Sequence, residues 1–206
     1  MRIAIWFIAA ALGWYVGGIN PSIALSKAIY HEDIRDRGSG NPGFTNFKRV
    51  YGGKYSWFVF ALDLFKGAAM CLAFGLWFRH LGFDFQLGAA FTGLFVMLGH
   101  SFPLQYKFKG GKGFLVLLSE LFVLDWRAGL IAFALMTILL LKTKYMSLAT
   151  MCALTVSAVC LFVFGCNIPA AVIYAACVLF MVARHRENIK RLINGTENTF
   201  HLGSKK

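Results

Sequence analysis

The chain has few acidic residues and no pattern of metal-binding or paired cysteines. Asp and Glu account for 9 of the 206 residues, against 21 Lys and Arg, and all charged residues together make up only 15%. None of the five cysteines has the spacing of a zinc site or of a CxxC pair. They lie in or beside apolar stretches, where a thiol acts as a small hydrophobe. The sequence therefore predicts no metal site, no disulfide framework and no cofactor bound through cysteine.

Apolar residues dominate what is present. They make up 58% of the chain, and the mean hydropathy is +0.63. A soluble domain of this length cannot bury so much apolar surface, so we expect lipid to cover the remainder. The first apolar stretch runs to about Leu25 without a small-residue cleavage site. This pattern favours a retained membrane span over a signal peptide.

Seven apolar segments are candidate spans, and none alternates as a lipid-facing barrel strand would. The fourth and fifth are shorter than the roughly 17–25 residues of a full crossing. They are also compatible with one re-entrant pair around residues 125–127. We therefore expect an all-α, polytopic membrane bundle of about seven transmembrane helices, forming a single domain over residues 1–206. The segments are roughly 2–27, 54–78, 86–104, 113–124, 128–141, 147–164 and 168–183.

Basic residues are distributed unequally between the two ends of these spans. With the N-terminus outside and the C-terminus in the cytoplasm, 17 of the 21 Lys and Arg residues fall on the cytoplasmic side. They flank apolar spans and do not form the aromatic-interleaved stripe of a nucleic-acid-binding face. The net charge of +12 thus favours anionic head groups and anionic substrates as partners, with no nucleic acid. We expect the functional groups at the cytoplasmic face.

Three polar segments on that side carry candidate chemistry. Residues 105–113 place three lysines and three glycines between apolar runs, a composition that suits a phosphate and is also found where helices are capped. Residues 38–46 combine glycines, hydroxyls and amides that suit a polyol or phosphate, or form only a turn. The basic segment after Arg184 is typical of a lipid anchor, although it also carries His185 and Asn188.

Together, these segments resemble the three signature motifs of the bacterial acyl-phosphate:glycerol-3-phosphate acyltransferases (PlsY). The resemblance covers nearly the whole chain, and residues 63–67 and 144–148 fit the same family. The matching motifs are Gly38-Ser39-Gly40-Asn41-x-Gly43-x-Thr45-Asn46 with Arg49, Gly99-His100-x-x-Pro103 with Phe108-Lys109-Gly110-Gly111-Lys112-Gly113, and Arg184-His185-x-x-Asn188-Ile189-x-Arg191-Leu192-x-x-Gly195-x-Glu197.

The resemblance implies a bacterial inner-membrane enzyme that acylates the 1-hydroxyl of glycerol 3-phosphate from a fatty acyl phosphate. The products are lysophosphatidic acid and inorganic phosphate, and the family uses no metal or organic cofactor. Lys109 and Lys112, with the N–H groups of Gly110 and Gly111, are expected to hold the donor phosphate. Catalytic roles are implied for Ser39, Lys112, His185 and Asn188. Substrate-binding roles are expected for Ser39, Asn41, Thr45, Asn46, Arg49, His100, Lys109, Gly110, Gly111, Lys112, Thr150 and Arg191.

Several questions stay open at this stage. The general base is His185, His100 or the donor phosphate itself. The chain departs from the family pattern at Gly18 and Asn20 in the first span and at Leu115 and Val116 after the glycine-lysine motif. The alternative function is a transporter or exporter of a phosphorylated or other anionic metabolite, which needs polar groups within the membrane. Asp63 and Lys66 are such a pair, although they more simply neutralise each other or brace the cytoplasmic site. A catalytically inactive relative would have lost the motif cations, and this chain retains them. Acyl-chain preference and oligomeric state are not predicted.

Overall fold

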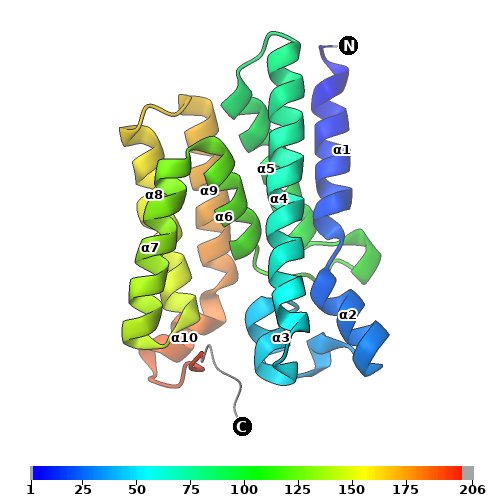
Figure 1. The fold of residues 1–206 in the computed structure, drawn as a ribbon, viewed down its shortest axis with the longest axis vertical. Helices are drawn as coiled ribbons and strands as arrows, with labels where there is room; N and C mark the ends of the chain where they lie inside the picture. The colour runs from blue at the N-terminus through cyan, green and yellow to red at the C-terminus, as the bar shows by residue number, and fades with distance from the viewer. Residues whose placement is uncertain (1, 201–206) are drawn as a thin grey trace.

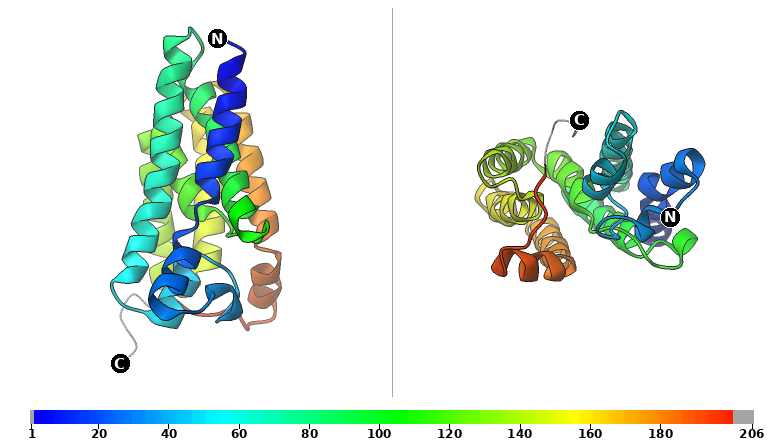
Figure 2. Two further views of the ribbon diagram at one scale, coloured as in Figure 1. Left: turned by 90° about the vertical axis from the view of Figure 1, so that its right-hand side faces the viewer. Right: turned by 90° about the horizontal axis from the view of Figure 1, so that it is seen from below.

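All regular structure in the described part of the chain is helical. The computed structural model describes residues 2–200, and the long helices lie side by side along one direction (Figure 1; Figure 2). The α-helices are α1 (Ala4–Gly18), α2 (Pro21–Tyr30), α3 (Phe44–Tyr51), α4 (Tyr55–His80), α5 (Phe85–Ser101), α6 (Phe114–Leu124), α7 (Trp126–Thr143), α8 (Met146–Val163), α9 (Ile168–Arg184) and α10 (Arg186–Ile193), with 3₁₀ turns at Ile34–Asp36 and Leu104–Tyr106.

The seven predicted apolar segments all form helices, and their lengths differ in an informative way. Five spans are long and apolar enough to cross a membrane, and α9 with α10, bent by 57° at their junction, forms a sixth candidate. The segment at 128–141 is longer than predicted, because Asp125 caps α7 through the backbone N–H groups of Arg127 and Ala128. Helix α6 has only 11 residues, about 16 Å, roughly half the depth of a bilayer core.

Helix α6 is short because the chain before it enters the bundle as a non-helical segment. After the turn Leu104–Tyr106, residues 107–113 pass back toward the centre, and α6 begins partway along the neighbouring helices (Figure 1). Gly113, at φ +83°, precedes its first residue. The glycine-lysine motif therefore reaches into the protein instead of remaining a surface loop.

Asn20 explains one departure from the family pattern. Its side-chain oxygen accepts a hydrogen bond from the Ile23 N–H at 3.0 Å and so caps α2, whose first residue is Pro21. Its amide nitrogen donates to the carbonyl oxygen of Pro42 at 3.0 Å. The break between α1 and α2 is thus retained, and it is tied to the loop that contains residues 38–46.

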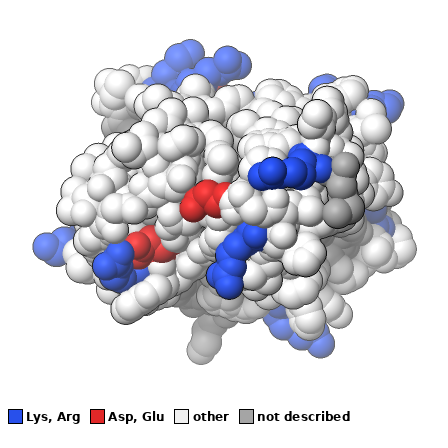
Figure 3. Space-filling view, turned by 90° about the horizontal axis from the view of Figure 1, so that it is seen from above, with Lys and Arg blue, Asp and Glu red and all other residues white. Residues whose placement is uncertain are grey.

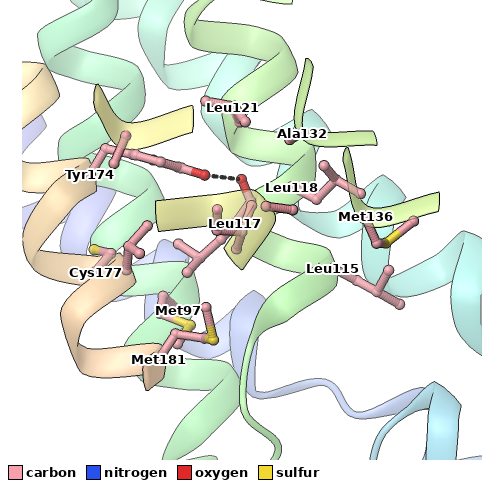
Figure 4. Packing of buried hydrophobic residues seen from close by; sticks show 14 of the residues in the cluster. Met97, Leu115, Leu117, Leu118, Leu121, Ala132, Met136, Tyr174, Cys177 and Met181 are labelled. Carbon is pink, nitrogen blue, oxygen red and sulfur yellow. Dashed lines mark hydrogen bonds between the residues drawn. The ribbon is translucent and has the colours of Figure 1, made fainter. Parts of the chain in front are cut away.

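A buried apolar cluster fixes the position of α6 against its neighbours. In Figure 4, Leu117 and Leu121 of α6 pack among side chains of α5, α7 and α9, including Met97 and Met181. The Tyr174 hydroxyl donates to the carbonyl oxygen of Leu117 at 3.2 Å. This packing holds the N-terminal end of α6 beside the polar groups described below.

The two ends of the bundle differ in structure and charge. Helices α2, α3 and α10 gather at one end, at the bottom of Figure 1, while the N-terminus and the α4–α5 turn lie at the other. The latter end, seen in Figure 3, is mostly uncharged with a few basic and acidic side chains. The polar, basic segments predicted from the sequence therefore collect at one end.

Candidate active site

One cavity at the basic end brings the three sequence motifs together. Its empty volume is about 930 Å³, including its open side. Eleven of the predicted site residues line it: Ser39, Asn41, Thr45, Asn46, Arg49, His100, Lys112, Thr150, His185, Asn188 and Arg191. Lys109, Gly110 and Gly111 do not, and Lys109 and Gly110 instead line a second hollow with Arg35 and Asp36.

The loop of residues 38–43 is held in shape by Asn46. The side-chain oxygen of Asn46 accepts from the Ser39 N–H at 2.8 Å, and its amide nitrogen donates to the carbonyl oxygens of Arg37 at 2.9 Å and Ile34 at 3.4 Å. Asn46 is 1% exposed. Its amide, which we expected to bind substrate, is thus already engaged in bracing the loop, whereas the Asn41 side chain has no hydrogen bond within residues 2–200.

Helix α3 places the Arg49 side chain in the wall of the cavity. Thr45 and Arg49 are four residues apart, and both line it. Gly43 precedes α3 with an extended backbone, so that the helix begins at the edge of the cavity. An arginine in this position offers two parallel N–H donors to a phosphate.

The paired glycines of the second motif form hydrogen bonds within the protein, whereas we expected their N–H groups to hold the donor phosphate. The N–H groups of Gly110 and Gly111 donate to the carbonyl oxygens of Ser101 at 3.2 Å and His100 at 3.0 Å, which caps the end of α5. Arg184 donates to the carbonyl oxygens of both glycines, at 3.3 and 3.2 Å. A Cβ at Gly110 would lie 2.1 Å from the His100 carbonyl oxygen, so close backbone approach requires glycine. These N–H groups are committed to the protein and are not free to hold a phosphate.

Lys112 begins a chain of polar contacts across the cavity. Its ammonium donates to the side-chain oxygen of Asn188, whose amide nitrogen donates to Glu197 at 2.6 Å. Glu197 also accepts from Ser147 at 2.8 Å and from Arg191 at 2.8 Å. Burial alone would raise the pKa of Glu197, but these hydrogen bonds outweigh it and lower that pKa.

Glu197 lines the cavity but is not among the site residues predicted from the sequence. The sequence contained a signal, because Glu197 ends the third motif, but only the fold shows that it connects α8, α10 and the tail. Asp63 and Ser147 also line the cavity and belong to the two additional family-like segments.

The cavity environment lowers the pKa of Lys112 to about 8. Burial is the largest cause, because it disfavours the charged ammonium, and the positive charge of Arg191 acts in the same direction. Glu197 opposes both. Lys112 is therefore mostly charged at neutral pH, but it loses its charge within a mildly alkaline range.

His185 is held in one tautomer. Its Nδ1 lies 2.8 Å from the carbonyl oxygen of Met181, which can only accept, so Nδ1 carries the proton and Nε2 carries the lone pair. The ring is buried, with 5% of its residue surface exposed, and burial favours its neutral form. His185 thus offers an acceptor nitrogen to the cavity.

The cavity combines a cationic part with an apolar wall. Arg49, Lys112 and Arg191 supply positive charge, while Glu197 is paired with Arg191 and Asp63 with Lys66. The apolar wall comes from α4, α6, α7 and α8, through Phe60, Phe114, Leu115, Met136 and Met146. Leu115, a departure from the family pattern, thus adds apolar surface. Such a site suits one anionic partner and one with a lipid chain.

The fold and the site together define a helical membrane protein with a cavity that has cationic side chains on one side and an apolar wall on the other. The family model described as glycerol-3-phosphate acyltransferase matches residues 7–195, and the chain belongs to this glycerol-3-phosphate acyltransferase family.

Named relatives support this assignment over nearly the full length. A glycerol-3-phosphate acyltransferase of Finegoldia magna is 38% identical and aligns over 90% of this chain and 91% of its own. One from Aquifex aeolicus is 39% identical, over 82% and 85%. The crystal structure of PlsY (YgiH), an integral membrane glycerol 3-phosphate acyltransferase in its glycerol 3-phosphate form, has a TM-score of 0.87 at 32% identity, covering 95% of this chain and 96% of that one. Its lysophosphatidic acid form gives a TM-score of 0.82.

Proposed function

We propose that this protein transfers a fatty acyl group from an acyl phosphate to the 1-hydroxyl of glycerol 3-phosphate. The products are lysophosphatidic acid and inorganic phosphate, in the first step of phospholipid synthesis. The observation that carries the proposal is the single cavity in which Arg49, Lys112 and His185 meet an apolar wall. It provides for two phosphate groups, a hydroxyl acceptor and an acyl chain at once.

The main task of such an enzyme is to hold two anionic substrates together. An acyl phosphate is a mixed anhydride with a good leaving group, so no strong protein nucleophile is required. Arg49, with Ser39 and Asn41, holds the phosphate and hydroxyls of the acceptor. Lys112 at the N-terminal end of α6 holds the donor phosphate, where the helix dipole adds to its charge. Positioning of the hydroxyl against the acyl carbon then supplies a large part of the rate.

The His185 tautomer supports a role for this residue at the acceptor hydroxyl. Its unprotonated Nε2 accepts the hydrogen bond of the hydroxyl and orients one oxygen lone pair toward the acyl carbon. As the new C–O bond forms, the bond to phosphate breaks, and the hydroxyl proton passes through His185 to the departing phosphate. Burial of the ring disfavours its charged form, so His185 passes the proton on and does not retain it.

The cavity is placed at the cytoplasmic face of the bacterial inner membrane in this proposal. The support is the basic end that contains α2, α3 and α10, since basic residues favour the cytoplasmic side. Glycerol 3-phosphate reaches the cavity from water there, and the acyl chain reaches it from lipid. Membrane lipid is thus the environment from which the acyl chain of the donor enters.

The donor is tested with the purified protein in lipid nanodiscs. Glycerol 3-phosphate is supplied with palmitoyl phosphate in one reaction and palmitoyl-CoA in another, and lysophosphatidic acid and phosphate are measured. We expect equal amounts of the two products from palmitoyl phosphate and none from palmitoyl-CoA. Turnover with palmitoyl-CoA alone would refute the acyl-phosphate assignment, and absence of product from both donors would refute the acyl transfer.

A further inference from the structure

A buried lysine beside the cavity contacts a carboxylate, a backbone carbonyl oxygen and a histidine ring. The Lys66 ammonium lies 2.7 Å from Asp63 Oδ1, 2.8 Å from the Ile19 carbonyl oxygen and 3.0 Å from His100 Nδ1. All three side chains are buried, with exposures of 7% for Lys66, 2% for Asp63 and 4% for His100. An ammonium has three donors and no acceptor. Lys66 donates one N–H to the Ile19 carbonyl oxygen and one to His100 Nδ1, while Asp63 pairs with it as an ion.

This arrangement fixes the proton on the His100 ring. The nitrogen that accepts from Lys66 has no hydrogen of its own, so the neutral ring is protonated at Nε2. A proton on Nδ1 would point at an ammonium hydrogen, and an imidazolium would set a second positive charge 3.0 Å from the first. Asp63 Oδ1 is nearer to Lys66 than to His100, at 2.7 against 3.6 Å, so the carboxylate is the ionic partner of the lysine.

The Nε2–H of His100 is open because residue 111 is glycine. A Cβ built at Gly111 would lie 2.2 Å from His100 Nε2, so any side chain there would cover the donor. Within residues 2–200 this nitrogen has no hydrogen-bond partner, and His100 lines the cavity. The two histidines of the cavity therefore offer opposite groups, an N–H from His100 and a lone pair from His185.

We propose that His100 is a catalytic residue whose Nε2–H donates to the carbonyl oxygen of the acyl donor, and that Lys66 is a positioning residue that fixes its tautomer. As the acceptor hydroxyl attacks, the carbonyl oxygen gains negative charge, which the N–H stabilises. The C–O bond to phosphate then breaks and the carbonyl re-forms. A preorganised donor of this kind contributes roughly 10²–10³ to turnover. The inference rests on the acyl transfer proposed above.

The tautomer is tested without any turnover. The full chain, with ¹⁵N-labelled histidine rings, is studied by NMR in nanodiscs, and the His100 signals are assigned by their loss in His100→Gln. We expect a protonated Nε2 and a bare Nδ1 at His100, with the reverse at His185. In Lys66→Met, the His100 pattern should change while that of His185 stays the same. A protonated Nδ1 at His100 in the unaltered protein would overturn the proposal, whatever the acyl donor is.

Kinetics test the role of the donor. Glutamine retains an N–H donor and leucine does not, so we expect kcat to fall about 10²–10³-fold in His100→Leu and markedly less in His100→Gln. The KM for glycerol 3-phosphate should change little, because the acceptor phosphate is held elsewhere. His80→Leu is the matched control. His80 is the last residue of α4, at the end of the bundle away from the cavity, so this variant should retain full activity. A kcat within about threefold of the unaltered enzyme in a folded His100→Leu protein would contradict the role.

Discussion

At the residue scale, the charge of Lys112 is the property most sensitive to conditions. Its pKa of about 8 is depressed from the ordinary value of 10.5, so the ammonium is present below pH 8 and is lost as the pH rises through it. Substrate phosphates ionise near pH 6 and do not contribute on the alkaline side. We expect kcat/KM for the acyl phosphate to fall above an apparent pKa of about 8, as measured from pH 6.5 to 9.5.

The control for this profile is Lys112→Arg. A guanidinium stays charged throughout the range, so the alkaline decline should disappear or shift upward by more than one pH unit. Lys112→Ala should lose about two to three decades of turnover at pH 7. An unchanged alkaline limb in Lys112→Arg would assign the titration to another group.

Arg49 is expected to act on the acceptor more than on the donor. Arg49→Lys removes the paired N–H donors while keeping one positive charge. The KM for glycerol 3-phosphate should rise roughly tenfold to a hundredfold, as for a loss of about 1.5–3 kcal/mol. Steady-state kinetics with each substrate varied in turn provide the measurement. A similar change in both KM values would mean that Arg49 does not discriminate between the two phosphates.

At the scale of elements, two asparagines at the loop before α3 differ in their contacts: one stabilises the loop, and the other is available to substrate. Asn46 holds three backbone groups of this loop, and Asn41, in the same cavity wall, has no side-chain hydrogen bond within residues 2–200. Asn46→Ala should lower the melting temperature and raise the KM for glycerol 3-phosphate, because buried N–H and C=O groups lose partners at about 1–3 kcal/mol each.

Asn41→Ala is the matched comparison. It should raise the same KM while leaving the melting temperature within about 1–2 °C, since it removes no internal bond. Thermal unfolding in one fixed detergent and initial rates distinguish the two variants. Equal melting temperatures for both would show that Asn46 does not brace the loop.

At the scale of the whole molecule, the charge asymmetry of the bundle predicts its orientation. Single cysteines in a cysteine-free background at Lys109 and Arg186, both exposed, should react only with reagents admitted to the cytoplasm. A cysteine at Arg79, near the opposite end of α4, should react from outside in intact cells. Labelling of Lys109→Cys from outside would place the cavity on the wrong face for the proposed function.

Hydropathy and charge alone predicted the class of fold and the segments that form helices. These properties follow from how each stretch partitions between lipid and water, which neighbouring residues largely determine. The motifs also identified most of the cavity wall, including Arg49, Lys112 and His185. Groups that bind anions have recognisable side chains, so their identity can be read in the sequence before their position is known.

Only the tertiary structure decided how those groups are used. Gly110 and Gly111 cap α5, Asn46 braces a loop, Lys109 lies outside the cavity, and Glu197 joins three segments. A hydrogen bond depends on where two groups meet in space, and the partners of Lys112 and Arg184 lie more than seventy residues away along the chain. Composition and spacing show which donors and acceptors exist, whereas packing decides which are already satisfied and which remain free for substrate.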